Sequence, residues 1–364
     1  MSTDQVLLAR DVIARCGALG FAAAGVCRAS PTTREAELRR WIAAGMHGEM
    51  DFLERYLPIM LDPARELPGV RSVIMVADLY SSRHEGPKSV PPPTDGPRGT
   101  IARYARGKDY HRVIKKRLHA LADSFRPAHP GHKFRSFVDT APVLEREYAA
   151  RAGLGYAGKH TLLIHPRLGS FTLLGGIYTT LELDPPPEQP VATDHCGTCT
   201  RCIDACPTGA ITPNHVDATR CISYLTIERT TAIDPAFHAA IGGWIYGCDI
   251  CQDVCPHNSP RSSDPGQPMP EVRDDLRPRR DGFDLLDVLG WNEEARRVAF
   301  STSAMKRANL AMMKRNALIA LTNSILSSGD HDGALARRIL AVSIDADEDE
   351  MVRVTASQCL ARLG

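Results

Sequence analysis

The 364-residue chain lacks several features that would assign it quickly. Neither sign of charge is in excess, since 44 lysines and arginines stand against 43 aspartates and glutamates, so the overall charge predicts no partner. No run approaches the roughly 20 apolar residues that a membrane-spanning helix needs. The N-terminus has no basic segment followed by an apolar one, unlike a secretory signal. We therefore expect a cytoplasmic, monomeric protein of two or three domains.

The sequence also lacks a nucleotide-binding motif in the structural context that such a motif requires. No P-loop is present, and the glycines with dinucleotide spacing, Gly153, Gly155 and Gly158, follow an expected helix rather than a strand. Glycines at this spacing allow the backbone to approach a flat or bulky ligand. An ordinary loop between a helix and a strand explains them equally well.

Cysteine is abundant, and eight of the eleven cysteines lie between residues 196 and 255. The first run reads C-x-x-C-x-x-C-x-x-x-C-P, the second is one cysteine shorter, and Cys221 stands between them. In two-cluster ferredoxins, three thiolates of one run hold a 4Fe–4S cluster and the fourth reaches the other cluster. One predicted ligand set is Cys196, Cys199, Cys202 and Cys255; the other is Cys206, Cys221, Cys248 and Cys251. Structural zinc is the alternative.

The remaining cysteines, Cys16, Cys27 and Cys359, are expected to be small buried hydrophobic residues. Two clusters carry single electrons, so a further group must accept these electrons. We expect that acceptor in the first 180 residues.

Apolar spacing predicts a mixed helical and strand fold before the cysteines. Helices are expected at 5–16, 34–44 and 110–125, and strands at 21–26, 73–77 and 134–138. Asp139 or Thr140 is expected to cap a helix that begins near Pro142. Residues 161–164 and 170–180 are expected to pair as strands around a turn at 166–169. The stretch 81–99, rich in proline and glycine, is expected to be a surface loop.

After a proline-rich boundary at 184–190, the cysteine module runs to about Pro256. From residue 283 onward the chain is expected to be almost wholly helical, with helices at 283–289, 293–300, 306–326, 333–342 and 348–363. Pairs of short helices favour stacked α-repeats. The predicted domains are residues 1–183, 184–260 and 261–364.

Two blocks of positive charge stand out locally. Residues 98–135 contain eleven lysines and arginines against two acids, and residues 305–315 contain four bases and no acid. Such blocks attract polyanions, nucleic acid first among them. A solvated helix face is an equally good explanation of either block.

Five segments together resemble the epoxyqueuosine reductase (QueG) family. They are IARYARGKDYH at 101–111, DTAPVLER at 139–146, GLGYAGKH at 153–160, CISYLTIE at 221–228 and IYGCDIC at 245–251. The resemblance extends in order from about residue 5 to 320. Tyr156 and His257 depart from the family's usual pattern, which has tryptophan at both positions.

The resemblance implies an α+β fold in three parts. These are a cobalamin-binding domain related to the reductive dehalogenases, a ferredoxin-like module with two 4Fe–4S clusters, and an all-helical HEAT-like region that binds tRNA. It also implies an oxidoreductase that reduces epoxyqueuosine to queuosine at the wobble position of a tRNA anticodon loop. This is the last step of queuosine biosynthesis, and base-off cobalamin serves as a cofactor.

The resemblance further assigns roles to single residues. Asp139 is the expected proton donor, although a helix N-cap carboxylate would be a poor acid. Contacts to cobalamin are expected from Tyr104, Asp139, Thr140, Lys159, His160, His165 and Ser170. Contacts to tRNA phosphates are expected from Lys306, Arg307, Lys314 and Arg315.

Two other functions fit the same motifs. One is a reductive dehalogenase-like enzyme acting on a small molecule, and the other is a ferredoxin-type electron-transfer protein. The basic blocks and the helical tail argue against the first, and the long N-terminal half argues against the second. The electron donor is not identified by the sequence.

Overall fold

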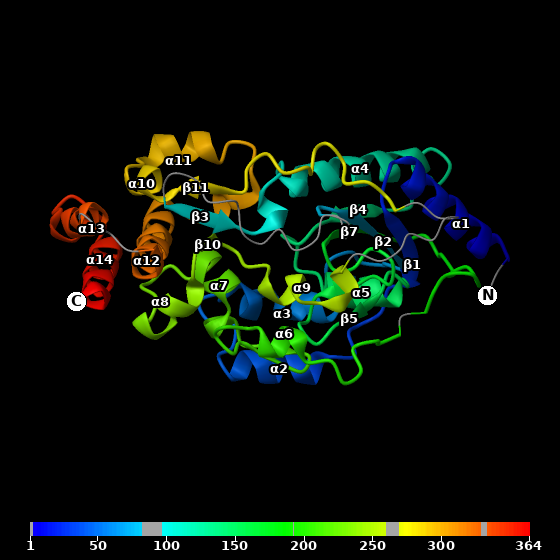
Figure 1. Ribbon diagram of the computed structural model, residues 1–364. Coiled ribbons are helices and arrows are strands. Elements are labelled where there is room, and N and C mark those ends of the chain that lie inside the picture. Colours follow the sequence, from blue (N-terminus) through cyan, green and yellow to red (C-terminus); the bar gives the residue numbers. More distant parts are fainter. Residues whose placement is uncertain (1–2, 82–96, 192, 260–268, 329–332) are drawn as a thin grey trace.

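A computed structural model describes residues 3–81, 97–191, 193–259, 269–328 and 333–364. Most of the expected surface loop at 81–99 lies outside these residues. Figure 1 shows the chain passing from a sheet-containing end near the N-terminus to a helical end at the C-terminus. In the part of the chain described here, no helix is long and apolar enough to cross a membrane.

The larger sheet has four antiparallel strands in the order β1-β2-β7-β4. Their bounds are Ala23–Arg28 for β1, Ser72–Leu79 for β2, Thr172–Thr179 for β7 and Phe134–Phe137 for β4. Every residue of β2 is buried, because Ile74 and Val76 face one core while Val73 and Met75 face another. A strand buried on both faces has no polar alternation, which explains the continuous apolar run in the sequence.

Helices cover both faces of this sheet. Helix α1 (Thr3–Ala18) and helix α4 (Tyr110–Phe125) contribute to the core on one face, and α5 (Glu145–Arg151) packs on the other. The predicted helix at 110–125 has the bounds of α4, since Ile114, Leu118, Leu121 and Phe125 form its buried stripe. Cys16, Cys27 and Cys359 are all buried, as predicted.

A second sheet joins segments that are far apart in the sequence. Strand β3 (Arg98–Ile101) lies between β10 (Trp244–Tyr246), which is parallel to it, and β11 (Gly282–Asp284), which is antiparallel. These strands come one from each of the three predicted domains. The three predicted domains therefore share backbone hydrogen bonds in this sheet. Their division stays a prediction.

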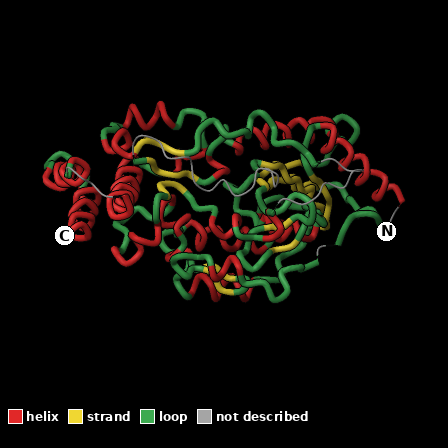
Figure 2. Tube along the Cα trace, in the orientation of Figure 1, coloured by secondary structure: helices red, strands yellow, loops and turns green. Residues whose placement is uncertain are grey.

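Short elements make up the cysteine module, as Figure 2 shows. The bounds of its helices and strands are α6 Arg201–Asp204, β8 Ile211–Thr212, β9 His215–Val216, α7 Ile222–Ile227, α8 Pro235–Ile241 and α9 Ile250–Asp253. Helices α6 and α9 pack against each other. Helix α2 (Glu35–Ala43) lies below both of them in Figure 1, whereas α3 (Phe52–Leu61) is drawn between them. Trp41 of α2 donates a hydrogen bond of 2.7 Å to the carbonyl of Val216.

The C-terminal part is helical, as predicted. Its helices are α10 Leu285–Leu289, α11 Glu293–Ala299, α12 Leu310–Ser328, α13 Ala334–Ile344 and α14 Glu350–Leu363. Helix α12 is surrounded by α8, α10, α14 and β10, so eleven of its residues are buried. A HEAT-like repeat in this region stays a prediction.

Three expectations about local structure are wrong. Asp139 and Thr140 cap no helix, because residues after β4 form a turn and α5 begins at Glu145. Strand β6 (Leu163–Ile164) pairs with β5 (Tyr156–Ala157), whereas β7 pairs with β2 and β4. The long apolar β7 gains more by entering the buried sheet than by pairing with a two-residue neighbour. Finally, β11 precedes α10, which Asp284 caps.

Candidate functional site

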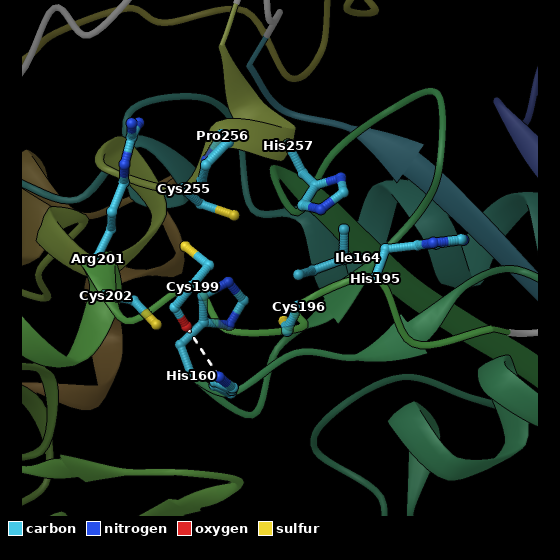
Figure 3. Close-up of a pocket in the computed structure, with 11 residues that line it drawn as sticks. His160, Ile164, His195, Cys196, Cys199, Arg201, Cys202, Cys255, Pro256 and His257 are labelled. Atoms are coloured by element: carbon cyan, nitrogen blue, oxygen red, sulfur yellow. Dashed lines mark hydrogen bonds between the residues drawn. The ribbon is translucent and has the colours of Figure 1, made fainter.

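Four cysteines from the two runs line a single cavity of about 140 Å³. Cys196, Cys199 and Cys202 come from the first run, and Cys255 comes from the end of the second. In Figure 3 their side chains surround one space, with the imidazole of His160 among them. The packing of α6 against α9 brings the two runs together. The fold thus brings together the four cysteines of one predicted ligand set.

His160 and Lys159 both belong to this cavity. His160 is 3% exposed, and its Nδ1 accepts a hydrogen bond of 3.2 Å from the backbone N–H of Leu162. The neutral ring therefore carries its proton on Nε2, which is buried and has no partner. The Lys159 ammonium donates to the carbonyls of Gly197 at 2.7 Å and Cys199 at 2.9 Å. It thus fixes the first cysteine loop.

The remaining four cysteines form a second group. Cys248 lies within electrostatic range of Cys221 and Cys206, and Cys251 lies within range of Cys248 and Cys221. Cys251 is also close to Cys202 of the first group. The two groups are therefore neighbours, which suits the passage of single electrons from one to the other.

The chemistry of both groups fits iron–sulfur clusters. Burial, together with the like charges of Cys248 and Cys221, raises the pKa of Cys251 well above its ordinary value. Burial and the nearby cysteines likewise raise the pKa of Cys255. Thiolates packed this way are unfavourable unless iron compensates their charge. An unpartnered N–H of His160 facing the first group suits an anionic cluster as acceptor. No group of described residues has the closer arrangement that a single metal ion requires.

The two positions that depart from the family pattern contact each other. The Tyr156 hydroxyl lies 3.1 Å from Nε2 of His257, and the two rings meet edge to face with centroids 6.0 Å apart. His257 lines the first cavity. Both departures therefore fall in one place, beside Cys255.

Asp139 lies in the turn after β4, with its side chain 44% exposed. Its carboxylate accepts a hydrogen bond from the hydroxyl of Tyr110 and lies 2.8 Å from Nε2 of His111. The ring of Tyr110 stacks on that of His111 with centroids 4.0 Å apart. Two donors from the start of α4 thus hold the carboxylate that the sequence singled out.

His111 lies between two carboxylates. Its Nδ1 is 2.6 Å from Asp109, the N-cap of α4. Burial lowers the pKa of His111, but hydrogen bonds and charge from Asp109 and Asp139 outweigh it and raise that pKa to about 9. Sequence reasoning did not assign Tyr110 or His111 a role, although both lie in the segment 101–111. A signal that could have found them is the D-Y-H triplet at the start of a helix.

A second carboxyl group lies near Asp139. Oε1 of Glu145, the first residue of α5, is buried without a hydrogen-bond partner. Burial, with the charge of Asp139, raises the pKa of Glu145 well above its ordinary value. Glu145 therefore lies within electrostatic range of Asp139.

The short helix η3 (Arg103–Ala105) connects the Asp139 side of the molecule to the second cysteine group. The backbone N–H of Arg103 donates to Asp249 at 2.8 Å, and its buried guanidinium pairs with Asp253. Both acids lie beside cysteine ligands of the second run. Tyr104 lies edge to face against Tyr110, with centroids 6.0 Å apart. Gly247 has φ +70°, and a side chain there would clash with Ala102, so glycine permits this close approach.

The other residues expected to contact cobalamin are dispersed. Thr140 is exposed beside Asp139, and Nδ1 of His165 accepts from the backbone N–H groups of Arg167 and Leu168. Ser170 is buried, where its hydroxyl donates to Gln252 at 3.0 Å and accepts from Asn258 at 2.8 Å. The polar groups of Ser170 and Lys159 are thus committed to the protein itself. Tyr104 lies within electrostatic range of Asp139, which Thr140 follows in the chain.

The prediction of tRNA contacts is wrong at two of its four residues, Arg315 and Lys314. Arg315 is fully buried and donates to the carbonyls of Leu225, Arg229 and Thr231 at 2.6–2.7 Å. The Lys314 side chain is 11% exposed and lies 2.5 Å from Glu348. A basic run on a helix wrapped on several sides must turn some charges inward. Lys306 is exposed, and Arg307 is 53% exposed but pairs with Glu228.

Helix α4 carries the more accessible positive charge. Arg112, Lys115 and Lys116 are exposed. None of the ion pairs found among the described residues involves them. Lys306 lies within electrostatic range of Asp109 at the start of the same helix. Three of these side chains therefore lie on the helix whose first turn contacts Asp139, and Lys306 lies near the start of that helix.

Two family models match parts of the chain. Residues 195–258 match a model described as a 4Fe-4S double cluster binding domain, and residues 61–140 match one described as epoxyqueuosine reductase QueG, DUF1730. The chain is 38% identical over 352 residues to the epoxyqueuosine reductase of Alicycliphilus denitrificans, covering 94% of this chain and 95% of that one. It is 37% identical over 357 residues to that of Burkholderia pseudomallei, covering 91% and 85%.

Solved structures give the same result. A crystal structure of an epoxyqueuosine reductase with an epoxyqueuosine-modified tRNA-Tyr stem loop aligns with a TM-score of 0.84 and 27% identity. The alignment covers 98% of this chain and 90% of that one. The epoxyqueuosine reductase from Streptococcus thermophilus aligns with a TM-score of 0.75 and 25% identity, covering 97% and 98%.

Proposed function

Since this chain belongs to the epoxyqueuosine reductase family, we infer that it reduces epoxyqueuosine to queuosine at the wobble position of a tRNA anticodon loop. That reaction is the last step of queuosine biosynthesis. The observation that carries this conclusion is the alignment of nearly the whole chain with a reductase solved with its modified stem loop. The cysteine cavity and the residues around Asp139 then serve the same reaction.

The chemistry requires both sites. Removing the epoxide oxygen as water consumes two electrons and two protons. The double-cluster domain supplies electrons one at a time. We propose that Cys196, Cys199, Cys202 and Cys255 hold one cluster and that Cys206, Cys221, Cys248 and Cys251 hold the other. Asp139 is the proposed proton donor to the substrate.

The family implies cobalamin as a further cofactor. When bound, it would supply a low-potential cobalt centre between the clusters and the epoxide. Tyr104, Asp139 and Thr140 fit such a role, because they lie together beside the cluster module. Lys159, His160 and Ser170 fit it poorly, since they face the first cysteine cavity or the protein interior. The relation to reductive dehalogenases stays a prediction.

The tRNA-binding surface that we propose is the exposed face of α4 together with Lys306. RNA phosphates are bound by accessible lysines and arginines, and loop bases are recognised after being splayed out. This surface flanks Asp139, where the modified base must arrive. We propose that residues 1–183 hold the substrate, 184–260 the clusters and 261–364 part of the tRNA contact.

One assay tests the function. Protein prepared without oxygen is incubated with epoxyqueuosine-containing tRNA and a chemical one-electron reductant, with and without cobalamin. Queuosine should form only when cobalamin is present. Conversion without any corrinoid would remove cobalamin from the proposal, and no conversion under any condition would overturn the function.

The role of Asp139 is tested by Asp139→Asn. The variant should retain iron and bind tRNA, yet turn over about 10²–10⁴-fold more slowly, as expected for loss of a positioned acid. Asp123→Asn, an exposed acid on α4 that pairs with Arg126, is the matched control. Full activity of Asp139→Asn would remove this carboxyl group from the mechanism.

A further inference from the structure

We propose that His111 is the proton reservoir of the active site, which recharges Asp139 through their 2.8 Å contact. The proposal deepens the function above and rests on it. A proton donor must hold a proton when the substrate arrives. The Asp139 carboxyl group faces two donors, Tyr110 and His111. Of these two side chains, the imidazole of His111 is the one that can carry and release a proton near physiological pH.

The contacts of His111 suit this task. Nε2 lies 2.8 Å from Asp139 and Nδ1 lies 2.6 Å from Asp109. An imidazole between two carboxylates is held protonated and in one orientation. Asp109 is in turn fixed as the N-cap of α4 and by its backbone N–H, which donates to Thr302 at 2.7 Å. The His111 side chain is 25% exposed, so solvent can return the lost proton.

The proton balance is as follows. One proton moves from Nε2 of His111 to Oδ1 of Asp139 and then to the epoxide oxygen as a carbon–oxygen bond breaks. The electrons of that bond remain on oxygen, and the two reducing electrons come from an external one-electron reductant through the clusters. His111 is left neutral and takes a proton from solvent. A second proton reaches the oxygen as the second carbon–oxygen bond breaks, so water leaves, and the two reducing electrons form the carbon–carbon double bond.

Other charged groups near His111 are consistent with this role. Asp109 and Asp139 favour its cationic form, Glu145 lies within electrostatic range of it, and Lys306 acts on Asp109. Tyr110 remains protonated, since burial and the charge of Asp139 raise its pKa. Its hydroxyl group therefore orients Asp139 rather than supplying the proton.

The test compares the wild-type protein with His111→Gln, which keeps a hydrogen-bonding side chain but cannot carry the proton. Single-turnover rates are measured from pH 6 to 10 with pre-reduced protein. The wild-type rate should fall above pH about 9, where His111 loses its proton. His111→Gln should react about 10²–10⁴-fold more slowly and lack this fall. An unchanged rate with the same alkaline limb would overturn the proposal.

Two further measurements separate this role from a structural one. Asp109→Asn removes one of the two carboxylates, so the alkaline limb should move to lower pH; a limb that stays in place contradicts the proposal. Because the folded pKa of His111 lies above the unfolded value, its stabilising effect is complete below pH 6.5 and lost as pH rises through 9. His111→Gln should therefore show a smaller fall in melting temperature over that range. If wild-type protein itself fails to convert the tRNA, the proposed function fails instead.

Discussion

At the scale of single residues, the surroundings of Asp139 decide what it can do. As a helix N-cap it would be a stabilised carboxylate and a weak proton source. In the structure it lies in a turn, facing Tyr110 and His111, with Glu145 nearby. The acid function that we propose thus depends on residues from two separate segments. No single position supplies it.

His160 offers a residue-scale prediction about the first cluster. Its Nε2–H faces the cysteine cavity without a protein partner. Hydrogen bonds to cluster sulfurs stabilise the reduced state, so His160→Phe should lower the midpoint potential of one cluster. A hydrogen bond is worth about 1 kcal/mol, which corresponds to a shift of some tens of millivolts. A redox titration followed by electron paramagnetic resonance measures it.

The control for this prediction is His160→Asn, which retains a side-chain N–H donor. It should recover part of the lost potential at unchanged iron content. Equal potentials for the wild-type protein and His160→Phe would show that the imidazole does not contact the cluster.

At the scale of elements, the segment 221–228 connects three parts of the fold. The hydroxyl of Tyr224 accepts a hydrogen bond from the backbone N–H of Glu49, and the hydroxyl of Thr226 accepts one from the backbone N–H of Gly247. Glu228 pairs with Arg307. One short helix, α7, therefore fixes the loop before α3, the second cysteine run and the start of the C-terminal helices. Each side chain has a different partner.

Arg315 gives a prediction about folding. Arg315→Met keeps much of the side-chain volume but leaves the carbonyls of Leu225, Arg229 and Thr231 without a donor. Buried unpaired acceptors cost about 1–3 kcal/mol each, so the free energy of unfolding should fall by more than about 3 kcal/mol. Urea denaturation measures this loss. The control is Arg307→Met, which removes an exposed ion pair and should cost less than about 1 kcal/mol.

The exposed face of α4 gives a prediction about tRNA. The double variant Lys115→Ala, Lys116→Ala removes two accessible charges. Affinity for the stem loop should weaken most at low salt, and the slope of log affinity against log salt should flatten by roughly 0.7 per charge. Arg297, paired with Glu294 on α11, is the control position. A slope that Lys115→Ala, Lys116→Ala leaves unchanged would place the tRNA elsewhere.

At the scale of the whole molecule, the clusters and the sheets have separate roles. The four-stranded sheet has large cores on both faces. Around Cys255 the buried cluster of apolar residues is small, comprising Tyr156, Ile164 and Cys255. Iron should thus contribute much of the local stability of the cysteine loops.

Removal of iron tests this division. After oxidation and chelation, hydrogen exchange should become faster in the cysteine loops between 196 and 255, whereas β2 and β7 should stay protected. The measurement is hydrogen–deuterium exchange with mass spectrometry on the full chain. Loss of protection throughout the large sheet would mean that the clusters hold the whole fold together.

The sequence by itself determined the parts that depend on local pattern. Cysteine spacing predicted a double-cluster module, which the matching family model confirms, and apolar periodicity located α4 and β2. Charge, by contrast, was misjudged at Lys314 and Arg315, because a basic run does not reveal which of its side chains other elements will cover.

Only the tertiary structure decided which distant residues meet. His111 reaches Asp139 because α4 begins beside the turn after β4. Strand β3 likewise pairs with β10 and β11, which follow it by more than 140 residues. His160 faces the cysteines because a short hairpin returns it to their cavity. A linear pattern records neighbours along the chain, whereas a reaction needs neighbours in space, and packing selects those.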